Sequence, residues 1–496
     1  MQQIITLVVF VTGAILAALA ASLGMAGTLH LTSRREHGYL HWMFYAIVLM
    51  LALGSLLSGR NVTNTTLISI EPVMEGSNIL LKIAQPLVSL LLLTVAGERL
   101  ISHWLQRGKG QWTPPVLLLA FIVFWLGSVA APAVLGAHPF FSHDYVYPLI
   151  IGMAAVLSSG IERDLAFKAA RTALLLFMAA SVLLIAIQPG LVLDINYNQG
   201  LMPGVPRLTG LAAHAVSLGI LSQLGLLCLI AYPYPQAWLN RLAWVIGLSV
   251  LFLAQSKTTW ISFVLCAVCI AGVRKGSALW RRVGDPVRPE VGIVALLAFM
   301  AAVLVMALVL MFGDLGGRLQ HFFNTSEGAQ LASMTGRDLI WAIAWQEWQL
   351  HPVFGYGPEI WETNFRLSIG MPNATHAHNQ FMDTLSRSGT VGAVALVVYA
   401  LVLLALSLRH ARASRGMSLA LFVALALRSL SEVPLSLFGY GPELLTQVLL
   451  LITLAASARQ ARPLKAQTPQ STQTAQAAAV AQAHSSSPPF FAGFHA

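Results

Sequence analysis

Charged side chains are scarce in this chain of 496 residues, because Asp, Glu, Lys and Arg together make up only 10% of it. A soluble globular domain usually has about 25% charged residues. Hydrophobic residues account for 57% of the sequence, and the mean hydropathy is +0.72. A chain of this composition has no way to cover its apolar surface in water. The composition therefore excludes a soluble protein and indicates a multi-pass integral membrane protein.

Cysteine is also rare, and its positions argue against redox or metal chemistry. Cys228, Cys266 and Cys269 all lie inside apolar runs. The last two share a helix face, but two thiols within a membrane span do not make a closed metal site. We therefore expect these cysteines to have packing roles.

Three sequence signatures of common enzymes are missing. No Walker A motif is present, so no ATP-driven step is visible. No Gly-x-Ser-x-Gly elbow is present either. The aspartates are too dispersed to form the Asp-x-Asp pair that would hold a metal–nucleotide-sugar, since they occur only at Asp144, Asp164, Asp194, Asp285, Asp314, Asp338 and Asp383.

Long apolar runs dominate what is present, and a membrane span needs about 20 such residues. The runs predict an all-α, polytopic fold with about 12 transmembrane helices. The candidate spans are 3–26, 40–58, 78–97, 114–136, 144–160, 170–189, 209–232, 240–255, 258–273, 291–312, 388–408, 416–435 and 442–458. The run 416–435 carries Arg428 and Glu432, so we expect this helix to break or to end early.

Basic residues predict which loops face the cytoplasm. The formal net charge of +10 comes from short clusters between apolar runs, which is the positive-inside pattern. We therefore expect no nucleic-acid binding. The clusters 99–109, 163–171, 274–288 and 409–415 are assigned to the cytoplasm, together with the C-terminus. Arg34 and Arg35 conflict with this assignment if every candidate run spans, so the side of the N-terminus stays open.

This topology divides the chain into four parts. Residues 1–312 hold about ten transmembrane helices, and 388–458 hold the C-terminal ones. Between them, 313–387 form a large external loop that is too long to be a mere connection. Residues 459–496 form a cytoplasmic tail, which we expect to be disordered because it becomes rich in Ala, Gln, Ser, Thr and Pro.

The external loop contains a predicted amphipathic helix. Thr335 and Asp338 form a capping pair, and Trp341, Trp345 and Trp348 then recur at helical spacing. Such an aromatic face is typical of a helix lying on the bilayer surface. Arg337 would lie in the first turn, where a cation is unfavourable unless an anion is near. Its side chain is either solvated or in contact with a lipid headgroup, or it is part of a phosphate site.

A histidine motif precedes the span that begins near 388. His376, His378 and Asn379 follow a glycine-rich turn at 351–357, and Gly389 comes eleven residues after His378. That spacing would place His378 and Gly389 on one helix face, about three turns apart. With Gly392 one turn further, the small residues would let neighbouring helices approach closely. A metal bound by the two histidines is the alternative, but no carboxylate lies near them in the sequence.

Three more ionisable residues fall near the external membrane surface. Arg207 and His214 stand at the start of the run 209–232, and Lys257 stands between two short runs. Ionisable residues at membrane depth are functional candidates. Each one could be a headgroup contact, which is the simpler reading for Lys257. Together with Arg337 and His378, they favour a site for a lipid-linked phosphate.

At these residues the sequence resembles the O-antigen ligase family, within a superfamily of O-antigen ligases and polymerases. The resemblance rests mainly on one motif. In it, His378-Asn379 is followed after nine residues by Gly389, and after two more residues by Gly392. It is supported by Arg207 with Gly210, by Thr335-Gly336-Arg337, and by Ser256-Lys257 where relatives often have Ser-Arg. The order of spans and the late external loop agree over about residues 40–455.

The resemblance implies a metal-independent, inverting glycosyltransferase of the bacterial inner membrane, without cofactors and with a periplasmic active site. Its donor would be undecaprenyl-diphosphate-linked O-antigen, and its acceptor a sugar of the lipid A–core oligosaccharide. His378 would be the general base. Arg207 and Arg337, with Lys257, would hold the diphosphate. Asn379, His376, His214, Gly389 and Gly392 would support the site.

Two other acceptors fit the same sequence, and so does one different class of function. An O-antigen polymerase joins one lipid-linked glycan to another, and a protein O-oligosaccharyltransferase uses a protein hydroxyl. A flippase would also need basic residues for a lipid diphosphate. However, a transporter should show internal repeats, or charged or broken helices at the midplane. The only hint of such a helix is the pair of charges Arg428 and Glu432 in the run 416–435.

Overall fold

The computed structural model describes residues 19–20, 22–30, 37–62, 78–105, 113–195, 197, 204–283, 297, 300, 337–372 and 374–461. Within these ranges the chain is almost entirely helical, as the apolar runs predict. Its two short strands, β1 (Leu193–Asp194) and β2 (Arg207–Leu208), pair antiparallel with Asp194 opposite Arg207.

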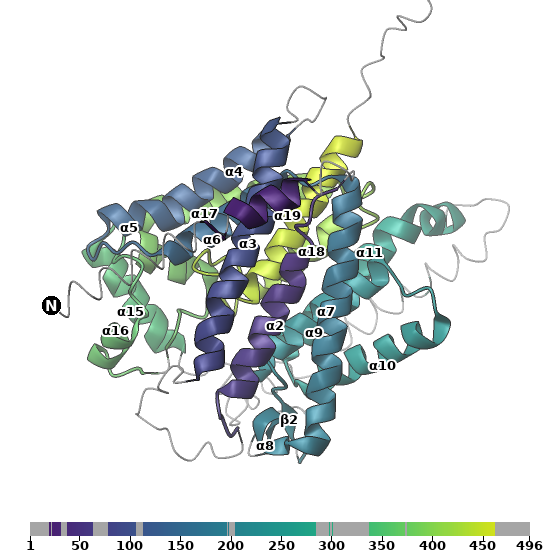
Figure 1. Ribbon diagram of the computed structural model, residues 1–496, viewed down its shortest axis with the longest axis horizontal. Coiled ribbons are helices and arrows are strands. Elements are labelled where there is room, and N and C mark those ends of the chain that lie inside the picture. Colours follow the sequence, from purple (N-terminus) through teal and green to yellow (C-terminus); the bar gives the residue numbers. More distant parts are fainter. Residues whose placement is uncertain are drawn as a thin grey trace, which may run out of the picture. The chain divides into compact units, whose positions relative to one another are not determined.

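The helices follow the chain in two groups (Figure 1). The first comprises α2 (Trp42–Leu57), α3 (Ile79–Leu105), α4 (Pro115–Trp125), the π-helix η1 (Leu126–Ala130), α5 (Ala131–Leu135), the 3₁₀ turn η2 (His143–Tyr145), α6 (Val146–Val156), α7 (Gly160–Ile187), α8 (Pro189–Val192), α9 (Ala215–Ala231), α10 (Ala237–Leu253) and α11 (Lys257–Val283). The second comprises α15 (Arg337–Leu350), α16 (Thr363–Ser368), α17 (Gln380–Arg409), α18 (Met417–Ser429) and α19 (Glu443–Gln460).

Five helical segments are long and apolar enough to cross a membrane. They are Ile79–Leu105, Pro115–Leu135, Gly160–Ile187, Lys257–Gly276 and Gln380–Arg409. Four shorter apolar helices are α2, α9, α10 and α18. The total of about 12 spans stays a prediction, since the runs 3–26 and 291–312 lie largely outside the described residues. The tail beyond residue 461 lies outside them as well.

Two predicted boundaries can be compared with the structure directly. Helix α18 ends at Ser429, so the expected early end before Glu432 is confirmed. The basic stretch 163–171 is not a loop, because α7 already begins at Gly160. Ser159 and Glu162 form a reciprocal capping box that starts the helix upstream of the apolar run. Hydropathy alone does not detect this signal.

The packing of the helices in the core positions the elements that carry the candidate site residues. Helix α9 is apolar on all sides and is buried over most of its length, packed against α7, α10 and α11. Helix α17 packs against α4, η1 and α15, and α18 packs against α11 and α17. These contacts place the N-terminal end of α17 beside the segment that follows α18.

Helix α17 is interrupted at Gly389, which corrects the predicted register between His378 and this glycine. The helix begins only at Gln380, and Gly389 has φ 62° and ψ −162°. The glycine-rich segment 352–357 crosses α17 at this break. Its Pro352 and Val353 carbonyls accept hydrogen bonds from the N–H groups of Thr390 and Val391. The break therefore leaves these two donors satisfied.

Small residues do permit the close helix approach expected at Gly392. A Cβ added at Gly392 would lie 3.2 Å from the carbonyl oxygen of Gly127 in η1. The hydroxyl of Ser388, one turn earlier, donates to the carbonyl of Ser128 at 2.8 Å. Gly127 and Gly392 thus face each other where α17 and η1 cross.

We expect Gly389→Ala to destabilise the folded protein. Its backbone conformation is essentially restricted to glycine and costs other residues of order 1–3 kcal/mol. A Cβ at Gly389 would also lie 2.4 Å from the Val353 carbonyl oxygen. The melting temperature of the detergent-purified variant should fall. Gly54→Ala in α2 is the matched control, because nothing lies within 4 Å of its Cβ. Equal melting temperatures for the two variants would contradict this account of the break.

Candidate active site at the start of helix α17

The loop before α17 is held by side chains on both sides of His378. Asn379 caps the helix, because its side-chain oxygen accepts from the N–H groups of Phe381 and Met382. Asp383 accepts from the N–H of Ala377, and Trp341 of α15 donates to the Ala377 carbonyl. His378 itself has φ 49°, in the left-handed region. The imidazole is therefore presented from a fixed turn and not from a helix face.

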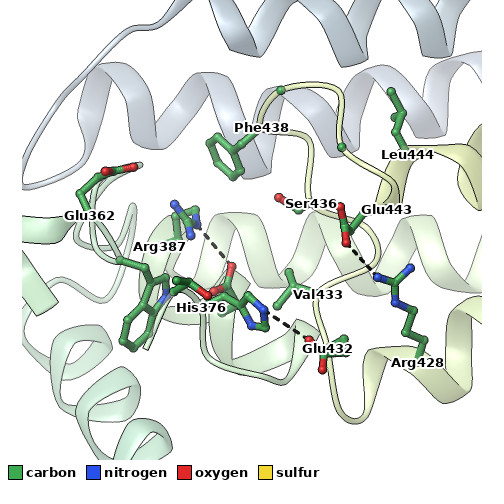
Figure 2. Close-up of a pocket in the computed structure, with 15 residues that line it drawn as sticks. Glu362, His376, Arg387, Arg428, Glu432, Val433, Ser436, Phe438, Glu443 and Leu444 are labelled. Atoms are coloured by element: carbon green, nitrogen blue, oxygen red, sulfur yellow. Dashed lines mark hydrogen bonds and ion pairs between the residues drawn. The ribbon is translucent and has the colours of Figure 1, made fainter. Parts of the chain in front are cut away.

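Glu432 joins both histidines, although it follows α18 and lies far from them in the sequence. Its Oε2 is 3.3 Å from Nε2 of His376 and 3.5 Å from Nδ1 of His378. Its Oε1 is 4.0 Å from the guanidinium of Arg337. The carboxylate is buried, and Figure 2 shows its contact with His376. One acidic group thus gathers three of the residues that the sequence singled out.

The charges in this cluster favour an ionised glutamate beside a neutral His376. Burial acts to raise the pKa of Glu432, but hydrogen bonding with His378 and the positive charges of His376, His378 and Arg428 hold that pKa below its ordinary value. Burial and the charge of His378 lower the pKa of His376. Glu432 is therefore a carboxylate at neutral pH, when His376 carries no charge.

Hydrogen bonds also determine which ring nitrogen of His376 carries the proton. Its Nδ1 accepts from the backbone N–H of His378 at 3.0 Å. In a neutral imidazole the other nitrogen must then carry the hydrogen, so Nε2–H faces Glu432. The Oε2 atom of the same carboxylate lies 3.5 Å from Nδ1 of His378, so Nδ1 is the ring nitrogen that faces Glu432.

The three groups could in principle hold a metal ion, since His376, His378 and Glu432 offer ligand atoms within 4.8 Å of one another. The hydrogen bonding does not fit such a site. A metal-binding histidine usually donates its other ring N–H to an acceptor. Here Nδ1 of His376 faces a backbone donor. Metal binding at Nε2 would set two donors against each other, so the loop is arranged for a proton on His376 and not for a metal.

Arg337 begins α15, as the capping pattern predicts, although Thr335 lies outside the described residues. Two of the tryptophans make hydrogen bonds within the protein that the sequence did not predict. Besides the bond from Trp341, Trp348 donates to the hydroxyl of Thr390 in α17, whereas Trp345 is exposed. Trp341 therefore attaches α15 to the histidine loop and Trp348 attaches it to α17, which holds Arg337 beside that loop.

Arg207 lies on strand β2. Its Nε donates to the carbonyl of Ala254 at 3.0 Å, and its guanidinium lies 4.3 Å from the ring centre of Tyr197. His214 caps α9, with Nδ1 accepting from the N–H of Val216. Burial lowers the pKa of His214, and Glu432, Arg207 and His378 all act on this ring electrostatically. His214 therefore interacts electrostatically with Arg207 and with the cluster around Glu432.

Lys257 is the first residue of α11, three residues after the Ala254 carbonyl that holds Arg207. It makes no ion pair among the described residues. Gln255 in the same turn donates to the Val205 carbonyl. The turn therefore supports Arg207 through its backbone, while a phosphate contact from Lys257 stays a prediction.

Two residues of this region were not identified from the sequence. Glu432 was noticed only as a charge in an apolar run, and its contact with the histidines depends on how α17 and α18 pack. Arg60 had no distinguishing signal. Its guanidinium donates to the carbonyls of Gly210, Ala212 and Ala213, and so holds the turn between Arg207 and His214.

A comparison with known families matches the part of the chain that contains the histidine loop. No curated protein matches this sequence. The family model described as O-antigen ligase matches residues 242–397. That range contains Lys257, Arg337 and the entire segment from His376 to Gly392, whereas Arg207, His214 and Glu432 lie outside it. This match spans less than half of the chain, so the chain is similar to the O-antigen ligase family over residues 242–397. Helices that are long and apolar enough to cross a membrane agree with this similarity.

Proposed function

We propose that this protein is an O-antigen ligase of the bacterial inner membrane. It transfers the O-antigen polysaccharide from undecaprenyl diphosphate to a sugar of the lipid A–core oligosaccharide, at the periplasmic face. The reaction is metal-independent and inverts the anomeric carbon. The observation that carries this proposal is the contact of one buried carboxylate, Glu432, with His376, His378 and Arg337.

His378 acts as the general base in this scheme. Its Nε2 takes the proton from the acceptor hydroxyl while the hydroxyl oxygen forms a bond to the anomeric carbon of the donor. Glu432 holds the proton on Nδ1 and stabilises the imidazolium that forms. This is the role that a buried carboxylate has behind a catalytic histidine in other transferases and hydrolases.

Arg207 and Arg337 act on the other half of the reaction. The bond between the anomeric carbon and the diphosphate oxygen breaks, and its electron pair leaves on undecaprenyl diphosphate. Guanidinium groups bind such an anion through directed, charge-assisted hydrogen bonds. They therefore provide the charge stabilisation that other transferases obtain from a metal ion.

An apolar groove next to the histidine loop suits the lipid carrier. It has a volume of about 290 Å³ and lies between α17 and α18. Asn379 and Gln380 form part of its wall, and Leu403, Phe422 and Leu425 continue it along the helices. A polyprenyl chain is the one occupant that this position favours, since its diphosphate end would lie beside His378.

We expect Glu432→Gln to reduce transfer by about 10²–10⁴-fold, because the amide neither fixes the proton on Nδ1 of His378 nor stabilises the imidazolium. Initial rates should be measured with the purified variant at saturating donor. Glu347→Gln is the control, since it removes a carboxylate from α15, the helix that carries Arg337. Unchanged turnover in a folded Glu432→Gln variant would exclude this glutamate from the mechanism.

Complementation tests the assigned reaction as a whole. The gene should restore ladder-bearing lipopolysaccharide to a ligase-null strain, as seen on a gel. Long lipid-linked glycan without attachment to lipid A–core would identify a polymerase instead. Glycosylation of a protein without any lipopolysaccharide ladder would identify a protein O-oligosaccharyltransferase.

A further inference from the structure

A cavity of about 340 Å³ lies beside the Glu432 cluster and has no role in the scheme so far. Its wall combines the start of α17, the segment after α18 and the beginning of α19 (Figure 2). The lining residues include Trp361, Glu362, His376, Asp383, Arg387, Arg428, Glu432, Ser436, Phe438 and Glu443. Its size is at the lower end of the range of roughly 300–1,000 Å³ that is typical of ligand pockets.

The charges on the wall disfavour an anionic occupant. Four carboxylates line the cavity, those of Glu362, Asp383, Glu432 and Glu443, but only the two guanidinium groups of Arg387 and Arg428. Asp383 pairs with Arg387 at 3.3 Å, and Glu443 pairs with Arg428 at 3.0 Å. Because both arginines are already paired, a diphosphate would meet the excess negative charge of the wall.

Several donors on this wall nevertheless lack acceptors. Among the described residues, Nε and one terminal nitrogen of Arg428 and Nε1 of Trp361 have no hydrogen-bond partner. These groups are not solvated at the surface, since the Arg428 side chain is 10% exposed and Trp361 is 4% exposed. Buried donors are nearly always paired, so an acceptor from outside the described chain is needed here.

A neutral sugar meets these requirements. Each hydroxyl both donates and accepts, so it can accept from Arg428 or Trp361 and donate to Glu362 or Glu443. The ring of Phe438 adds an apolar surface, and its position is fixed because Arg387 packs 4.6 Å from its centre. An isolated anion would use the donors but would be repelled by the four carboxylates of the wall.

We propose that this cavity binds the neutral sugar ring that carries the acceptor hydroxyl, an inference that rests on the proposed ligase function. The cavity lies beside the base, because His376 and Glu432 line it and both contact His378, whereas His378, Arg207 and Arg337 do not line it. The acceptor ring therefore approaches from one side of the cluster, and the diphosphate is held on the other. Arg428, Trp361 and Glu443 determine which sugar is accepted and have no part in bond cleavage.

The test uses the purified full-length protein and separates the two substrates. Arg428→Gln should raise the KM for lipid A–core about 10-fold, the effect of losing hydrogen bonds to a charged group, and leave the KM for the lipid-linked donor unchanged. Arg412→Gln is the matched control, since it removes an exposed arginine from the turn that precedes α18. A folded Arg428→Gln variant with an unchanged acceptor KM, or with an equal rise in both KM values, would overturn the assignment.

Ser436→Trp provides a second variant that retains every charged group. The new indole should fill the cavity and abolish saturation-transfer NMR signals from a deacylated core oligosaccharide. This binding assay needs no transfer, so it distinguishes the two proposals. Wild-type protein that binds the oligosaccharide but transfers no glycan refutes the ligase function and leaves the sugar site standing. Equal binding by wild type and folded Ser436→Trp refutes the sugar site.

Discussion

His378→Ala is expected to lose nearly all transfer activity while the protein stays folded in the membrane. Removal of a general base typically costs about 10²–10⁴ in rate. The loop does not depend on this side chain, because Asn379, Asp383 and Trp341 hold the neighbouring backbone. The effect should therefore appear in turnover and not in the melting temperature.

The rates should be compared with those of His143→Ala. That histidine lies on another loop, and its side chain is 80% exposed. We expect this control to transfer at the wild-type rate. Near-normal ligation by a well-expressed His378→Ala protein would remove this residue from the mechanism, however close it lies to Glu432.

The second large effect is expected at the two arginines. Arg337→Lys and Arg207→Lys should fail almost as badly as the alanine variants, because an ammonium group cannot reproduce the planar fork that binds a diphosphate. Loss of one such donor set costs about 10²–10³ in turnover. The double alanine variant should be little worse than either single one, since residues that act as a unit are not additive.

Arg366→Lys is the matched control for these substitutions. Arg366 lies in the same external segment, but its guanidinium donates to the Pro372 carbonyl and to Thr363, within its own loop. This change should leave turnover intact. Full activity in either Arg337→Lys or Arg207→Lys would end the hypothesis of a bidentate diphosphate clamp.

The sequence identified the residues that act through their own chemistry. His378 was recognised by its spacing to Gly389 and Gly392, Arg337 by its place in the first turn of a predicted helix, and Arg207 as an ionisable residue at membrane depth. The electrostatic link through His214 and the contact of Arg337 with Glu432 are consistent with their convergence. The start of α15 at Arg337 was also close to prediction, whereas α17 begins at Gln380, ahead of the apolar run predicted from 388 and after His378.

The contacts that set these residues in place could not be predicted in the same way. Glu432 reaches the histidines only because α17 and α18 pack together. This is a tertiary contact, and no local sequence signal predicts it. Gly389 was read as part of a continuous helix, since the crossing segment 352–357 lies more than thirty residues upstream. The argument that no carboxylate was near the histidines failed for the same reason.

The central claim is that residues of this chain perform the transfer without a divalent ion. The direct measurement mixes the purified protein with undecaprenyl-diphosphate-linked O-antigen and lipid A–core in the presence of EDTA, and follows lipopolysaccharide formation on a gel. We predict full formation of the ladder product by the wild type and none by His378→Ala. Product that forms only after a divalent metal is restored would contradict the account, and would make His376, His378 and Glu432 metal ligands.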